Sequence, residues 1–426
     1  MIKYIMAVHK YFFKNNHKNQ GERQGLRRAY LATNNYPNKK HLSRLAWTTI
    51  VMSVSLVLGL SGAAILYFVF PHKPSLNDDR YLDNTIFREP PNSIDLSPDS
   101  VDLNITSRLE SREGINPNWV YNVTNPTHFN PNDNLQKIVN EVVYTARMRG
   151  LPTNSLSIHL IDLNQQTEGT YQADVFRYPA SIPKLFWLVA YYSLQAERNI
   201  PPQPIDLPQM GCVTTICKLI QKSDNEAASR IVDFITDTTS ISHTEDYQTW
   251  LNKRYSVNYF FQKSGYSGIN ISQKNFPIPY LGMNYPQGWD LRMRGDNQPP
   301  IRNQMTARHA SRLMYEIGTY QAVSQTASMQ IMSLLKIDLN PQVWKPEEYD
   351  SVDGFLGKGI YQNRQKIDFY SKVGWTNDSR LEVALIHHRS KNRAYIISVF
   401  GDGAAYGEDW EFFPIISRLV YERMFE

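Results

Sequence analysis

Residues 181–192 read SIPKLFWLVAYY, and this stretch decides the interpretation of the whole chain. Pro183 is tolerated only in the first turn of a helix, so it predicts a helix from Ser181 to about Glu197. The side chains that follow Lys184 are apolar on all sides of this helix, which predicts that it is buried. Ser181 and Lys184 are three residues apart and therefore lie on one face, one turn apart.

A hydroxyl and an amine in this arrangement suit nucleophilic catalysis. Lys184 can accept the proton of Ser181 only as a neutral amine, and burial or a second cation lowers the pKa of a lysine. The Ser181 backbone N–H, at the helix start, can help bind an oxyanion. The same spacing recurs at Ser333 and Lys336, but that copy is predicted in mid-helix and lacks the proline. We therefore assign Ser181 as nucleophile and Lys184 as base.

A second motif, Ser223-Asp224-Asn225, opens another helical run. Taken alone it is an ordinary helix start. Together with the first motif it gains a chemical meaning, because a hydroxyl between two lysines can relay a proton toward the leaving group. We assign Ser223 to that relay and Asn225 to a substrate amide.

A third motif, Lys372-Val373-Gly374, lies at the end of a predicted strand. Lys372 is assigned as the second cation and the anion site. Gly374 lets a substrate backbone lie against the strand edge, and the N–H of Trp375 is the second oxyanion donor. A rival, Lys263-Ser264-Gly265, keeps a hydroxyl that Val373 lacks, but no strand, hairpin and terminal helix follow it.

The order of elements predicts the fold. Apolar residues, alternating at 156–163 and in 367–375, predict strands near both ends of the chain's second part, at 156–163, 367–375, 381–388 and 393–400. The last three are joined by tight turns, and 408–424 is predicted to be a closing helix. The segment between them is mostly helical to about residue 340, with a Tyr/Gly/Pro/Asn-rich loop at 255–305. We predict an α+β fold in which an antiparallel β-sheet is flanked by helices and accompanied by an all-helical lobe.

With these motifs in place, residues 134–426 resemble the class A β-lactamase family and its penicillin-binding relatives. The resemblance is carried by RYPASIPK (177–184), KSDNEAA (222–228), MTAR (305–308) and KVG (372–374) before TND (376–378). It implies a serine acyl-enzyme formed on a β-lactam or a D-Ala-D-Ala-like peptide, with no metal or organic cofactor. The enzyme class expected is a serine β-lactamase-like hydrolase.

Departures from the family pattern leave a second function open. Val373 stands where the family usually has a hydroxyl, and no Glu occurs between Glu245 and Glu316. Asp290, sixteen residues before Thr306, is the nearest equivalent of the deacylating glutamate, but it is one methylene shorter. The alternatives are a penicillin-binding or peptidoglycan-sensing module without turnover, and an esterase or D,D-peptidase on the same scaffold.

The first part of the chain has a different character. Residues 1–44 hold ten Lys/Arg and one acid, and the rest of the chain is mildly acidic, which argues against a nucleic-acid partner. Residues 45–70 carry no charge and as a helix measure about 39 Å, enough to cross a bilayer. The positive-inside rule predicts a single-pass inner-membrane protein with a cytoplasmic N-terminus and an external, periplasmic catalytic domain at 134–426. The proline-rich residues 71–133 are predicted to be an extracytoplasmic spacer.

The chain has two cysteines, Cys212 and Cys217. An external compartment permits a disulfide between them, and two buried thiols are the alternative. Their spacing, without a third ligand nearby, is not that of a zinc site.

Overall fold

The computed structural model describes residues 118–199, 212–241, 245–279, 282–295, 300–346 and 350–425. The predicted basic arm (1–44), the predicted span (45–70) and most of the predicted spacer lie outside these ranges. Within them, no helix combines the length and apolar character needed to cross a membrane.

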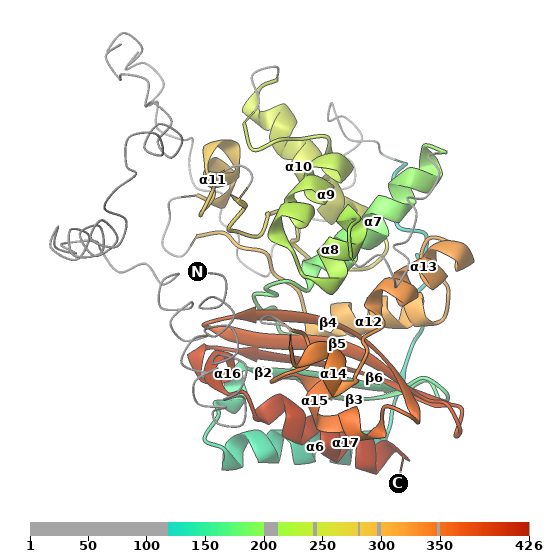
Figure 1. Ribbon diagram of the computed structural model, residues 1–426. Helices are drawn as coiled ribbons and strands as arrows, with labels where there is room; N and C mark the ends of the chain where they lie inside the picture. Colours follow the sequence, from blue (N-terminus) through green and yellow to red (C-terminus); the bar gives the residue numbers. More distant parts are fainter. Residues whose placement is uncertain are drawn as a thin grey trace, which may run out of the picture. The chain divides into compact units, whose positions relative to one another are not determined.

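Six strands and the helices around them form the described part of the chain (Figure 1). The strands are β1 (Asn130–Pro131), β2 (Leu156–Asp162), β3 (Thr167–Tyr171), β4 (Ile367–Thr376), β5 (Ser379–His388) and β6 (Arg393–Asp402). The α-helices are α6 (Asp133–Met148), α7 (Pro183–Glu197), α8 (Thr215–Gln221), α9 (Asn225–Thr236), α10 (Tyr247–Gln262), α11 (Gly288–Arg294), α12 (Ala307–Gly318), α13 (Gln325–Leu335), α14 (Pro341–Trp344), α15 (Leu356–Ile360), α16 (Ala404–Glu408) and α17 (Phe412–Phe425).

The strands form one sheet in the order β1-β3-β2-β6-β5-β4. The pairings among β2 to β6 are antiparallel, as the sequence predicts, and they join the first strands of the domain to the last. The two-residue β1 pairs with β3 in parallel, so the sheet is mixed. The prediction of a purely antiparallel sheet is therefore wrong at this edge, because a two-residue strand leaves no alternation in the sequence to detect.

Strand alternation explains why helices cover both faces of the sheet. On β5, Leu381, Val383 and Leu385 belong to one core cluster, which α7, α9 and α12 complete. Their neighbours Ala384 and Ile386 point to the other face and pack with α6, α15 and α17. In Figure 1, α6 and α17 accordingly lie on one side of the sheet, and the helical lobe lies on the other. The predicted α+β fold with a sheet flanked by helices is confirmed.

Two segments have more structure than the sequence alone suggested. The loop predicted at 255–305 contains the end of α10 and the short helix α11, whose turn is too brief to show helical periodicity. In the described end of the predicted spacer, Tyr121 is fully buried and its N–H bonds to Phe260 O at 3.0 Å. An extended segment anchored by single aromatic side chains has no periodicity, so composition alone marked it as a spacer.

Cys212 and Cys217 are joined in a disulfide next to α8. Of the two alternatives left open by the sequence, the structure therefore has the bonded one. The bond closes a small loop that includes the start of α8, the helix that leads to Ser223.

Candidate active site

The nucleophile candidate sits in a tight turn before α7. The helix begins at Pro183 with Ile182 at its N-cap, so Ser181 lies just outside it and does not cap it with its side chain. Ala180 has φ +46°, a left-handed conformation that is uncommon for a residue with a side chain. Ser181 is half-buried and remains accessible from solvent. Strained backbone of this kind concentrates at functional sites.

Lys184 reaches three predicted site residues from the first turn of α7. Its Nζ lies 3.1 Å from Ser181 Oγ, 2.7 Å from Asn225 Oδ1 and 3.4 Å from Ser223 Oγ, and it also donates to the Ser223 carbonyl. The side chain is fully buried. Burial and, after it, the nearby Lys372 ammonium hold the pKa of Lys184 well below its ordinary value, and Asp224 opposes this shift. A buried amine of lowered pKa next to a hydroxyl can act as a base.

Lys372 approaches the same group from the sheet. Its Nζ lies 2.9 Å from Ser223 Oγ and 2.8 Å from Val373 O. Burial lowers the pKa of Lys372 to about 7, while Glu382 opposes the shift. Ser223, with φ +50°, therefore places one hydroxyl between two lysine amines, as the sequence predicts. This arrangement can pass a proton from one amine toward a leaving group.

The order of residues in the second motif explains how Ser223 is held. Asp224 is the N-cap of α9 and accepts a hydrogen bond from the N–H of Ala227 at 2.7 Å. This cap starts the helix at Asn225 and leaves the Ser223 side chain outside it, facing the lysines.

Gly374 is required by packing against the nucleophile. A Cβ added there would lie 2.9 Å from Pro179 O and 3.1 Å from Ser181 N. β4, the last strand of the sheet, therefore approaches the backbone of the nucleophile more closely than any residue with a side chain would permit. The neighbouring Trp375 donates its indole N–H to Gly407 O at 3.1 Å and packs on Trp410, which fixes this end of the strand.

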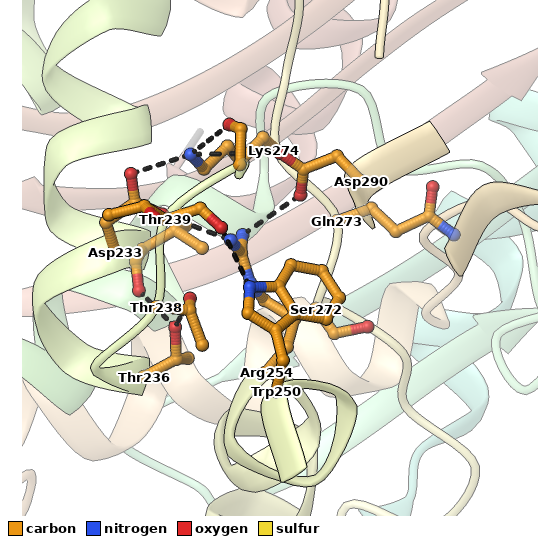
Figure 2. A network of polar contacts seen from close by, with 12 residues as sticks. Asp233, Thr236, Thr238, Thr239, Trp250, Arg254, Ser272, Gln273, Lys274 and Asp290 are labelled. Atoms are coloured by element: carbon orange, nitrogen blue, oxygen red, sulfur yellow. Dashed lines mark hydrogen bonds and ion pairs between the residues drawn. The ribbon is translucent and has the colours of Figure 1, made fainter. Parts of the chain in front are cut away.

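Asp290 is placed in a different environment from the one predicted. It is 2% exposed, and its carboxylate oxygens lie 3.4 Å from Arg254 Nη1 and 3.9 Å from Lys274 Nζ. Asp233 completes the cluster through contacts of 3.0 Å to Arg254 and 2.7 Å to Lys274 (Figure 2). Within the described residues, no contact joins Asp290 to Ser181.

A general base for deacylation needs a carboxylate that can hold a water against the acyl group. Asp290 lies in ionic contact with two buried cations, and its role as the deacylating base stays a prediction. The spacing that suggested the base could not reveal Arg254 and Lys274, because these cations come from other parts of the chain.

The rival motifs lie away from these groups. Ser264 is fully buried, and its hydroxyl donates to Tyr121 O. Ser333 bonds to Gln330 O at 2.7 Å, and Lys336 pairs with Asp368 at 3.0 Å. The structure therefore brings together Ser181, Lys184, Ser223, Asn225 and Lys372, and leaves out both rivals.

Two residues near the site were missed by sequence reasoning. Asn275 donates from Nδ2 to Ala180 O at 3.0 Å and so supports the turn before the nucleophile. Glu382 lies beneath Lys372, accepts from Ser371 Oγ at 2.6 Å and from Leu356 N at 2.7 Å, and burial raises its pKa to about 8. Glu382 could have been noticed, because it is the one acid in a strand whose sequence is otherwise largely apolar. Asn275 has no comparable signal in the sequence.

Family comparison follows this geometry. The model of the β-lactamase enzyme family matches residues 134–424, so the chain belongs to that family and has the fold of its serine hydrolases. Comparison with curated protein sequences finds no match.

Three solved structures are similar to this chain at low sequence identity. The β-lactamase from Sphaerobacter thermophilus DSM 20745 is 15% identical, with coverage of 67% of this chain and 96% of that one and a TM-score of 0.47. PBP-A is 16% identical, with coverage of 70% and 98% and a TM-score of 0.45. The TLA-3 extended-spectrum β-lactamase is 11% identical, with coverage of 68% and 100% and a TM-score of 0.47.

Proposed function

We propose that this chain is a membrane-anchored enzyme of the serine-hydrolase type that forms an acyl-enzyme on Ser181 with a β-lactam or a D-Ala-D-Ala-like peptide, and that this acyl-enzyme is hydrolysed slowly. The observation that carries the proposal is the convergence of Lys184 and Lys372 on Ser223, with Lys184 also 3.1 Å from Ser181 Oγ. Residues 45–70 are the proposed anchor, and the domain is proposed to face the periplasm.

The acylation step uses only side chains of this chain. Neutral Lys184 takes the proton of Ser181, whose Oγ attacks the carbonyl carbon of the substrate. The N–H groups of Ser181 and Trp375 stabilise the oxyanion. When the tetrahedral intermediate collapses, the C–N bond breaks, and the proton from Lys184 reaches the leaving nitrogen through Ser223. Asn225 orients the substrate amide, and Lys372 attracts the substrate's anionic group.

A second candidate differs only in what happens next. Because the Asp290 carboxylate is engaged by Arg254 and Lys274, the described residues offer no acid at Ser181 to activate the deacylating water. We therefore favour a long-lived acyl-enzyme, as in a penicillin-binding or peptidoglycan-sensing module, over rapid hydrolysis. An esterase or D,D-peptidase would use the same residues on another substrate.

Two measurements test the proposal. Fluorescent penicillin should label the full-length protein, and Ser181→Ala should abolish the label while Ser333→Ala, at the rival motif, leaves it intact. Equal labelling of Ser181→Ala would refute the role of Ser181. Hydrolysis of a chromogenic cephalosporin should then show a burst of about one equivalent without steady turnover, whereas sustained turnover would favour the hydrolase.

A further inference from the structure

A small polar cavity lies next to the turn that holds the nucleophile. Its volume is about 130 Å³, and its lining includes Tyr178, Asn275, Phe276, Arg294, Arg302 and Asn303. Tyr178 precedes Ser181 by three residues, and Asn275 is bonded to Ala180 O. The cavity therefore shares a wall with the turn that holds the nucleophile.

The lining of this cavity is cationic. It contains three bases, Lys274, Arg294 and Arg302, and no carboxylate. Lys274 is turned away, because its ammonium bonds to Asp233 and Ser240 (Figure 2). The two guanidiniums remain, and neither forms an ion pair with any residue that the structure describes.

The two arginines line the cavity together with one aromatic ring, that of Tyr178. The guanidinium of Arg302 lies 5.3 Å from the centre of the Tyr178 ring. Burial and, after it, the charge of Arg302 lower the pKa of Arg294. Arg302 is exposed and Arg294 is half-buried, so an anion can enter from solvent. Paired guanidiniums match the planar geometry of a carboxylate.

The cavity wall also carries an unused acceptor. Asn275 is 9% exposed, and its Oδ1 has no hydrogen-bond partner. The orientation of this amide is fixed, because the Nδ2 atom must face the carbonyl oxygen of Ala180. A ligand that fits the cavity therefore offers a donor to Asn275 as well as an anion to the arginines.

We propose that this cavity is a binding subsite for a carboxylate that lies next to an N–H, as in an N-acyl amino acid or the C-terminus of a peptide. The carboxylate lies between Arg294 and Arg302, and the N–H donates to Asn275 Oδ1. The subsite is separate from the anion site at Lys372. Its existence does not depend on acylation at Ser181.

The test measures binding of N-acetyl-D-alanine and N-acetyl-L-alanine to full-length Ser181→Ala protein by calorimetry at constant ionic strength. We expect millimolar binding that weakens at least fivefold with Arg294→Gln or Arg302→Gln. Arg292→Gln is the matched control, because Arg292 lies on the same helix and stacks on Tyr247 instead. The methyl ester, which lacks the anion, and N-acetylsarcosine, which lacks the N–H, should each bind more weakly.

Several results would overturn the proposal. One is unchanged affinity in the Arg294→Gln/Arg302→Gln double variant. Another is loss of binding with Lys372→Gln, which would place the ligand at the other anion site. Tighter binding of inorganic phosphate would contradict the carboxylate class. Asp296 lies outside the described residues, and binding seen only with Asp296→Asn would mean that the chain neutralises its own arginines.

One further arm identifies the source of the carboxylate. If it belongs to the acylating substrate, saturating N-acetylalanine should slow penicillin labelling of wild-type protein at least twofold. If it belongs to a separate small molecule, binding should persist and the labelling rate should stay unchanged.

Discussion

The lysine pair makes a quantitative prediction about the pH dependence of acylation. Lys184 works as a base only when it is neutral. Lys372 supports protonation of the leaving group and binds the substrate's anionic group only when it is protonated. In wild-type protein the rate of Ser181 acylation should therefore rise as Lys184 loses its proton, at a pH well below the ordinary lysine range. It should fall again near pH 7, where Lys372 loses its own proton. The profile is a bell.

Replacing Lys372 with Gln removes the second charge, and the structure sets the size of the effect. Both amines bond to Ser223 Oγ, at 3.4 Å and 2.9 Å, so they are at most about 6.3 Å apart. At an effective dielectric constant of about 20, two unit charges at that distance repel by about 2.6 kcal/mol. This corresponds to about two pKa units. The rising limb of Lys372→Gln should therefore move up by about two pH units, and the fall near pH 7 should disappear.

Stopped-flow labelling with a fluorescent penicillin from pH 5 to 10 measures this profile. Lys336→Gln is the control, because it removes an exposed lysine whose partner, Asp368, lies on β4 together with Lys372. Its profile should match the wild type. A rising limb that stays at the wild-type pH in Lys372→Gln would refute the electrostatic coupling of the two lysines.

Three further perturbations follow from the packing. Gly374→Ala should slow acylation of Ser181 at least tenfold, because the new methyl group meets Pro179 O and Ser181 N. Circular dichroism should show that the fold is retained. An unchanged acylation rate would contradict the close approach of β4 to the turn before α7. Asp290→Asn should lower the free energy of unfolding by roughly 3 kcal/mol in denaturant titrations, because it breaks a buried ion pair. If this variant instead loses only deacylation and unfolds with the wild-type free energy, Asp290 acts as a base. Reducing the Cys212–Cys217 disulfide should lower the free energy of unfolding by about 2 kcal/mol, the value expected for a loop this short. An unchanged free energy of unfolding after reduction would contradict this prediction.

The fold was predictable because its strongest signals are local. Strand β4 alternates clearly, β5 and β6 are largely apolar runs joined by a tight turn, and Pro183 marks the start of α7 to within two residues. Features that depend on distant partners were not predictable. The parallel edge strand β1 and the anchoring of Tyr121 on α10 leave no periodic trace.

The site shows the same division. Ser181, Lys184, Ser223 and Lys372 were found because their motifs carry the chemistry within three residues of chain. The surroundings of Asp290 could not be predicted, and they matter because a carboxylate becomes a base or an ion-pair partner according to the cations beside it. Those cations come from α10 and from the segment after it, which no spacing rule connects to α11.

The most direct measurement is the intact mass of the protein over time after addition of a penicillin. We expect wild-type protein to gain the mass of one penicillin, to keep it for many minutes, and to carry it on the peptide that contains Ser181. Lys184→Ala should gain it at least a hundredfold more slowly. No adduct on wild-type protein, or an adduct on another residue, would contradict the claim that Ser181 is a nucleophile activated by Lys184.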